Sequence, residues 1–91
     1  MQYGAKPSFD RSFKKLTKSE KIQAEQSINK LYDFFERRQQ LPKGLGLKRL
    51  GSFYWEIRSG IDIRIIFSIE DNFVTFLFVG NHDQIAKFIR S

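Results

Sequence analysis

The strongest constraint on the fold is a two-residue alternation of large apolar side chains between Leu47 and His82. Nearly every odd position in three successive segments of this stretch is apolar. These positions carry Phe53, Trp55, Ile57, Ile61, Ile63, Ile65, Phe67, Ile69, Phe73, Leu77 and Val79. Because successive side chains of a strand point to opposite faces of its sheet, the pattern predicts three strands that share one buried face. We expect these strands to form an antiparallel meander.

The even positions of the same stretch include charged residues, which constrain how the strands pair. A hairpin that paired odd with even positions would place Asp62 and Arg64 in the apolar face. Both connections should therefore contain an odd number of residues. We expect three-residue turns at 59–61 and 70–72. This register places Glu56 opposite Arg64 and Arg58 opposite Asp62.

Two stripes of apolar residues with helical spacing precede the alternating stretch. The first consists of Phe9, Phe13 and Leu16, and the second of Ala24, Ile28, Leu31 and Phe35. Each stripe is typical of a helix that packs one face on a core. Thr17 and Glu20 have the spacing of a capping box, so the second helix begins there, and we extend it to about Gln39, before the breaker at 41–44. The two helices should form a hairpin that covers the odd face of the sheet.

The two ends of the chain complete the predicted fold. A brief edge strand is expected within residues 2–6. A short C-terminal helix, capped by Asn81 or Asp83, is predicted from the apolar residues Ile85, Phe88 and Ile89. The fold class is therefore α+β: an N-terminal strand, a two-helix hairpin, a three-stranded antiparallel meander and a short C-terminal helix, in one domain over residues 1–91.

Composition limits the function. Sixteen Lys and Arg against ten Asp and Glu give a net charge of +6, which favours a polyanionic partner, either a nucleic acid or an acidic protein. Surplus lysine that only aids solubility is the alternative. With no cysteine and a single histidine, the chain lacks the usual ligands of a transition metal, and we expect no metal or other cofactor. The lack of a signal sequence and of an apolar run of about 18 residues predicts a cytoplasmic protein outside the membrane.

A basic segment lies between the second predicted helix and the sheet. From Arg37 to Trp55 the chain has no acidic residue, and the cations of this segment are Arg37, Arg38, Lys43, Lys48 and Arg49. Because Gly44 and Gly46 let the backbone approach a ligand, the segment can line a phosphate track. A solvated loop rich in lysine is the alternative. Tyr54 can either stack on a base or pack within the sheet.

His82 is the natural candidate for proton transfer, because histidine titrates near neutral pH. The expected register brings Arg58 and Arg64 to the same face, and the fixed fork of arginine suits a phosphate whose charge grows in a transition state. Each of these residues also has a purely structural explanation. A lone histidine can be a cap or a surface residue, and the arginines can form cross-strand ion pairs with Glu56 and Asp62.

Several of these residues carry a resemblance to a known family. The segment 47–58, LKRLGSFYWEIR, is followed by Gly60, Arg64 and the run IIF at 65–67. Together with VGNHD at 79–83 and the order of the expected elements, this pattern resembles the RelE/ParE superfamily of type II toxins over nearly the whole chain. The resemblance implies an RNA endonuclease that cuts mRNA, commonly in the ribosomal A site, and that a cognate acidic antitoxin holds inactive.

The resemblance also implies roles for individual residues. Arg64 matches the arginine of the family's central strand, and Arg58 matches the arginine that ends the preceding strand. Lys48 and Arg49 match the basic pair before it, and His82 matches the histidine that acts as acid or base in the members that carry one. The implied reaction needs no metal: the ribose 2′-OH attacks the adjacent phosphate and leaves a 2′,3′-cyclic phosphate, or its 3′-phosphate product, and a 5′-OH end. RNA binding is expected from Arg49, Lys43, Tyr54 and Arg38.

Three other functions remain open on the residues alone. A gyrase-directed toxin of the same fold would poison a topoisomerase without cleaving nucleic acid, and it should tolerate the loss of His82. A non-catalytic RNA-binding module would share the basic charge, and it should bind RNA with a steep salt dependence but without turnover. A toxin that has lost its activity would still bind its antitoxin.

Overall fold

The computed structural model describes residues 1–37 and 45–90 of the chain. In chain order the elements are β1 (Gln2–Ala5), α1 (Pro7–Lys14), α2 (Lys18–Arg37), β2 (Lys48–Arg49), β3 (Tyr54–Ser59), β4 (Ile63–Glu70), β5 (Phe73–Gly80) and α3 (His82–Arg90). The predicted N-terminal strand, helix hairpin, meander and C-terminal helix are all confirmed. β2 is an additional strand that the alternation does not predict, and Gln39, the expected end of the second helix, lies outside the described residues.

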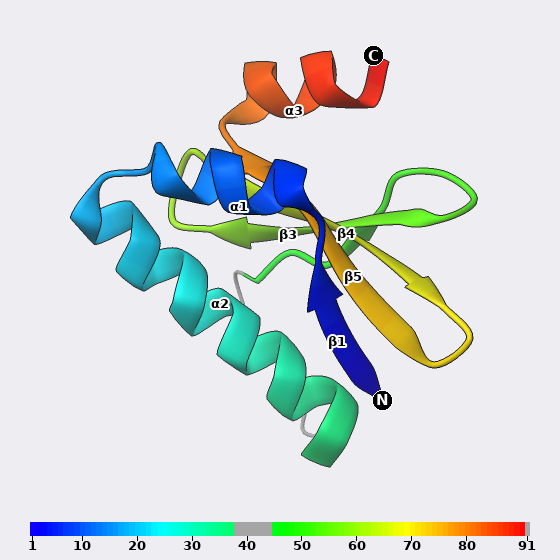
Figure 1. The fold of residues 1–91 in the computed structure, drawn as a ribbon. Coiled ribbons are helices and arrows are strands. Elements are labelled where there is room, and N and C mark those ends of the chain that lie inside the picture. The colour runs from blue at the N-terminus through cyan, green and yellow to red at the C-terminus, as the bar shows by residue number, and fades with distance from the viewer. Residues whose placement is uncertain (38–44, 91) are drawn as a thin grey trace.

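The strands form one sheet in the order β1-β5-β4-β3-β2. β1 runs parallel to β5, and the other neighbouring strands are antiparallel. α1 and α2 cover one face of the sheet, whereas α3 follows β5 and packs on β4 and β5 (Figure 1). None of the described helices is long and apolar enough to span a bilayer.

The buried face of the sheet is the odd face that the alternation predicts in β3 and β4. The main core contains Phe9, Ala24, Leu31, Leu45, Ile57, Ile63, Ile65, Phe67, Val74, Phe76 and Val79. Two residues next to β3 that were expected on this face are exposed instead: Phe53 is 58% exposed and Ile61 is 94% exposed. Phe53 precedes β3 and Ile61 lies in the turn after it, so the alternation of a strand does not govern either side chain.

The β3–β4 hairpin has the predicted loop length but a different register. Its three-residue turn starts at Gly60 rather than at Ser59, which sets Arg58 opposite Arg64. The predicted pairing of Arg58 with Asp62 is therefore wrong. Gly60 has a φ of +76°, a left-handed conformation that cannot continue a strand and that glycine adopts readily. The strand consequently ends one residue later than expected.

The β4–β5 turn contains two residues, Asp71 and Asn72, instead of the predicted three. Both have positive φ, 49° and 64°, the conformation of a type I′ turn, whose twist matches that of the flanking strands. Because a two-residue loop pairs odd with even positions, Val74 and Phe76 face the main core. Phe73, which we expected there, is 37% exposed.

A β-bulge restores the predicted parity further along β5. Ile66 pairs with Phe78, but Phe67 pairs with Phe76, so Leu77 is an extra residue on the bulged strand. Beyond this bulge the odd positions of β5 face the main core again. At the polar end of the sheet the side chains of β5 therefore point to the faces that the sequence predicts. Near the turn at 71–72 they point to the opposite faces.

α1 completes the edge of β5 where β1 ends. β1 stops at Ala5, and beyond it Ser8 Oγ donates a hydrogen bond to the carbonyl of Leu77 at 2.6 Å. Ser12 Oγ accepts a hydrogen bond from the backbone N–H of Val79 at 3.1 Å. These two serines provide hydrogen-bond partners for the backbone of β5 beyond the end of β1, and they hold α1 against β5.

α2 and α3 each begin with a reciprocal pair of side-chain caps. The N–H of Glu20 donates to Thr17 Oγ1 at 3.2 Å, and the N–H of Thr17 donates to Glu20 Oε1 at 2.8 Å, which confirms the predicted capping box. At α3, the N–H of Gln84 donates to Asn81 Oδ1 and the N–H of Asn81 donates to Gln84 Oε1, each at 2.9 Å. Asn81 is thus the cap of the two that we considered, and His82 becomes the first residue of α3.

Ser12→Ala should lower the free energy of unfolding by about 1–3 kcal/mol, because the buried N–H of Val79 would lose its acceptor. Urea denaturation followed by circular dichroism measures the change. Ser19→Ala, at an exposed position in α2, is the matched control and should shift the free energy by less than about 0.5 kcal/mol. Equal losses from the two variants would contradict the importance of the β5 edge contact.

Candidate active-site groove

A groove of about 300 Å³ lies between α3 and the polar end of β2, β3 and β4. It is lined by Gly46, Lys48, Leu50, Glu56, Arg58, Arg64, His82, Ile85, Ala86 and Ile89. The four residues that we predicted to be catalytic, Lys48, Arg58, Arg64 and His82, therefore lie around one space. Glu56 lies among them.

β2 positions Lys48 beside the groove. This short strand pairs Lys48 with Glu56 and Arg49 with Trp55. Because adjacent residues of a strand point to opposite faces, only Lys48 of the basic pair lines the groove. Arg49 instead donates to two backbone carbonyls at 2.8 and 3.2 Å, and its guanidinium carbon lies 5.8 Å from the centroid of the Trp55 ring.

Glu56 and Arg64 form an ion pair in the groove. Arg64 Nη1 lies 3.2 Å from Glu56 Oε2, and the two side chains are 22% and 8% exposed. The direct cross-strand partner of Glu56 is Ile66, so the predicted contact forms along a diagonal instead of straight across. The buried Nε–H of Arg64 has no hydrogen-bond partner among the described residues. Since buried donors are usually paired, this guanidinium retains the capacity to bind a further acceptor.

Arg58 brings a second guanidinium beside Arg64. The two residues are direct cross-strand partners, and like charges in such positions repel each other. The side chain of Arg58 passes over Gly46, where a Cβ would lie 3.2 Å from Arg58 Cγ and Cδ. Gly46 also has a φ of +60°, which favours glycine. The N–H of Arg58 donates to the carbonyl of Leu45 at 2.7 Å, so the backbone at 45–46 holds Arg58 over the groove.

His82 stands at the rim of the groove at the start of α3. Its side chain is 78% exposed, and its Nδ1 lies 3.6 Å from Asp83 Oδ1. Arg64 is the cross-strand partner of Gly80, two residues before the histidine, and this pairing brings the imidazole to the same groove as the guanidinium groups. The groove thus combines three cations with two groups, His82 and Glu56, that can take or give a proton.

Compared by sequence, the chain matches no protein-family model and no curated protein. Compared by structure, it is similar to YafQ from E. coli strain BL21(DE3), with a TM-score of 0.70 and 17% identity over 92% of this chain and 96% of that chain. A chain of the RelB–RelE antitoxin–toxin complex from Methanococcus jannaschii matches with a TM-score of 0.70 and 16% identity, over 97% of this chain and 98% of that one. The YoeB dimer from Staphylococcus aureus gives a TM-score of 0.66 and 18% identity, over 90% and 97%. The chain has the fold of RelE-like type II toxins.

The RelE-like fold confirms the resemblance that the sequence indicates. The residues expected to bind RNA are more scattered than the catalytic set. Tyr54 is 41% exposed and lies at the start of β3 on the same face as Glu56, but it does not line the groove. Arg49 lies on the opposite face of β2. Lys43 and Arg38 lie outside the described residues.

The apolar wall of the groove is the part that our sequence analysis missed. α3 supplies Ile85, which is 4% exposed, and Ile89, which is 40% exposed. The helical spacing of these residues predicts the helix, but it does not tell core packing from the lining of a groove.

Within residues 1–37 and 45–90, no cluster of three His, Cys, Asp or Glu side chains could hold a metal ion in this RelE-like fold.

Glu56→Gln should lower the free energy of unfolding by about 1.5–3 kcal/mol, because Arg64 would lose its charged partner in a largely buried setting. Asp33→Asn is the matched control. It breaks an exposed ion pair with Arg37, whose atoms lie 3.7 Å apart and whose side chains are 39% and 66% exposed, and it should change stability by less than about 0.5 kcal/mol. Urea denaturation of both variants measures the two free energies of unfolding. An unchanged value for Glu56→Gln would contradict a stabilising role of the ion pair.

Proposed function

We propose that this protein is the toxin of a type II toxin–antitoxin system and an endoribonuclease that cleaves mRNA on the ribosome. The observation that carries the proposal is the shared groove of Lys48, Arg58, Arg64 and His82 in a chain with a RelE-like fold. Positive charge and a proton carrier around one space are what a reaction at a phosphodiester requires.

The proposed reaction is a transesterification without a metal ion. The 2′-oxygen of one ribose forms a bond to the adjacent phosphorus, and the bond from that phosphorus to the 5′-oxygen of the next nucleotide breaks. The 2′-OH gives up its proton, and the departing 5′-oxygen receives one. The products are a 5′-OH end and a 2′,3′-cyclic phosphate or its 3′-phosphate hydrolysis product. His82 serves in proton transfer, which typically contributes about 100- to 10,000-fold to the rate.

Arg64 stabilises the charge that develops on the phosphate during this reaction. Glu56 orients its guanidinium, and the unpartnered Nε–H supports the binding of a further acceptor. Arg58 on β3 and Lys48 on β2 add positive charge to the same groove. An anion bound between Arg58 and Arg64 also relieves the repulsion of two like charges on paired strands.

The ribosome supplies the alignment that the chain does not supply alone. The groove is small and His82 is 78% exposed, so the chain does not enclose a flexible RNA. Correct alignment of reacting groups accounts for about 7–11 kcal/mol of a barrier in well-oriented systems. We assign this alignment to ribosome-bound mRNA. Additional RNA contacts come from Tyr54 by stacking and from the positive charges of Arg49, Lys43 and Arg38.

The proposed inhibitor is a cognate acidic antitoxin. A net charge of +6 favours such a partner. Two of the similar structures, the RelB–RelE complex from Methanococcus jannaschii and the DinJ–YafQ complex from E. coli, are toxin–antitoxin complexes. An antitoxin that covers the groove would block both phosphate binding and access to His82.

In a translating extract, the wild-type protein should create new 5′ ends within codons of a reporter mRNA, detected by primer extension. His82→Gln should slow this cleavage by about 100-fold or more, because the proton carrier is removed. The histidine is 78% exposed, so the variant should fold normally. Lys30→Ala, an exposed substitution on α2 that lies outside the groove, is the control and should cleave like the wild type.

The same reporter RNA without ribosomes tests where cleavage occurs. Cleavage of naked RNA at a comparable rate would contradict the dependence on the ribosome. A folded wild-type protein that produces no new ends in the extract would contradict the endonuclease and favour a gyrase-directed or binding-only role. Full activity of His82→Gln would remove the histidine from the mechanism.

A further inference from the structure

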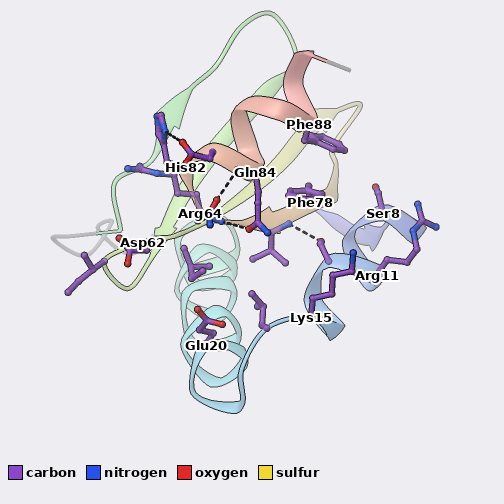
Figure 2. Close-up of a pocket in the computed structure, with 17 residues that line it drawn as sticks. Ser8, Arg11, Lys15, Glu20, Asp62, Arg64, Phe78, His82, Gln84 and Phe88 are labelled. Atoms are coloured by element: carbon purple, nitrogen blue, oxygen red, sulfur yellow. Dashed lines mark hydrogen bonds and ion pairs between the residues drawn. The ribbon is translucent and has the colours of Figure 1, made fainter.

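A second, larger cleft of about 800 Å³ lies between α1 and α3 (Figure 2). Arg64 and His82 line both this α1–α3 cleft and the groove. The two spaces therefore meet at the proposed site of cleavage. An RNA strand whose scissile phosphate lies beside Arg64 contacts a residue that lines both spaces.

One wall of the α1–α3 cleft carries two cations, Arg11 of α1 and Lys15, which directly follows the last residue of α1. Ser8, Arg11 and Lys15 line this wall, and their spacing of three and four residues places them on one side of the helix. Phe9 and Phe13 lie on the other side, where they pack in or against the main core. Arg11 and Lys15 are exposed, and neither forms an ion pair within the described residues.

The acidic residues of the cleft do not neutralise these two cations. Figure 2 shows Arg11 and Lys15 on the α1 side of the cleft, whereas Glu20 and Asp62 lie toward its other end. The α1 end of the cleft is therefore its positive end, and it suits an anionic ligand. Arg64 adds a positive charge on the side where Asp62 lies.

Aromatic side chains face the positive end of the cleft. Phe78 of β5 and Phe88 of α3 line the cleft and stack on each other with ring centroids 4.7 Å apart and an angle of 18° between the rings. Figure 2 shows both rings above the α1 wall that carries Arg11. A cationic wall opposite flat aromatic surface matches the two chemical parts of a nucleotide, the phosphate and the base.

We propose that the positive end of the α1–α3 cleft binds single-stranded RNA next to the scissile phosphate, with Arg11 and Lys15 contacting backbone phosphates. This inference rests on the proposed function of the groove. RNA fits the cleft better than an acidic protein segment does, because a strand held in the groove enters the cleft without a second partner. The contacts are to the backbone, so they add affinity and position the strand without reading its sequence.

Binding of an RNA of about 12 nucleotides, a length within the range that small single-strand binding modules cover, tests the proposal. The RNA is 2′-O-methylated throughout, which removes the attacking hydroxyl and prevents cleavage. Arg11→Ala/Lys15→Ala should reduce the slope of log affinity against log salt by about 1.4, the value for two lost phosphate contacts on a single strand. This corresponds to about 25-fold weaker binding at 0.1 M salt and little difference near 1 M salt, measured by fluorescence anisotropy.

Lys14→Ala/Lys18→Ala is the matched control. It removes the same charge from exposed positions at the end of α1 and the start of α2, and neither residue lines the cleft. It should weaken binding by less than about threefold, because charges outside the contact are screened over roughly 10 Å at 0.1 M salt. Equal weakening by both double variants would overturn the proposal, as would unchanged binding by the cleft variant or no RNA binding by the wild type.

A poly-glutamate peptide tests the other class of partner in the same assay. Loss of peptide binding in the cleft variant together with intact RNA binding would overturn the proposal and make the cleft a site for an acidic protein. The binding measurement needs no turnover, so a wild-type protein that binds RNA but never cleaves mRNA contradicts the proposed function alone. Cleavage by the wild type with unaltered RNA affinity of the cleft variant contradicts the cleft alone.

Discussion

The candidate site depends on which face of the sheet each side chain points to at the polar end. The two-residue turn between β4 and β5 reverses which residues face the helices, and the extra residue Leu77 reverses them back. As a result Gly80 pairs with Arg64, and α3 begins with His82 at the groove. Ser8 of α1 donates to the carbonyl of Leu77. One hydrogen bond from α1 therefore supports the irregularity that brings the histidine to the arginines.

The buried carboxylate of Glu56 organises the positive surface around it. Glu56 pairs with Arg64, while Lys48 and Arg58 line the same groove. One negative charge does not balance three cations, so the groove keeps a net positive charge that attracts an anionic ligand. Arg11 of α1 and Lys15, which follows α1, continue this charge into the α1–α3 cleft. Groove and cleft together form the continuous path that we assign to one RNA strand.

Local patterns in the sequence were enough to predict the helices, the capping box at the start of α2 and the buried face of β3 and β4, because these depend on neighbouring residues. The pairing of β5 was not predictable from alternation, since the turn at 71–72 and the bulge at Leu77 depend on backbone conformations that a hydrophobic pattern does not encode. The site was predictable as a set of residue types. Its geometry was not predictable, because the two-residue strand β2 leaves no periodic signal in the sequence. This strand is what turns the side chains of Lys48 and Arg49 to opposite faces of the sheet.

The chemistry of the RNA ends tests the central claim most directly. Fragments produced by the wild-type protein in a translating extract can be labelled by polynucleotide kinase with and without prior phosphatase treatment, and their 3′ ends can be typed by mass spectrometry. We predict 5′-OH ends that accept label without phosphatase, together with 2′,3′-cyclic phosphate or 3′-phosphate ends. Fragments with 5′-phosphate and 3′-OH ends would contradict attack by the ribose 2′-OH in this groove.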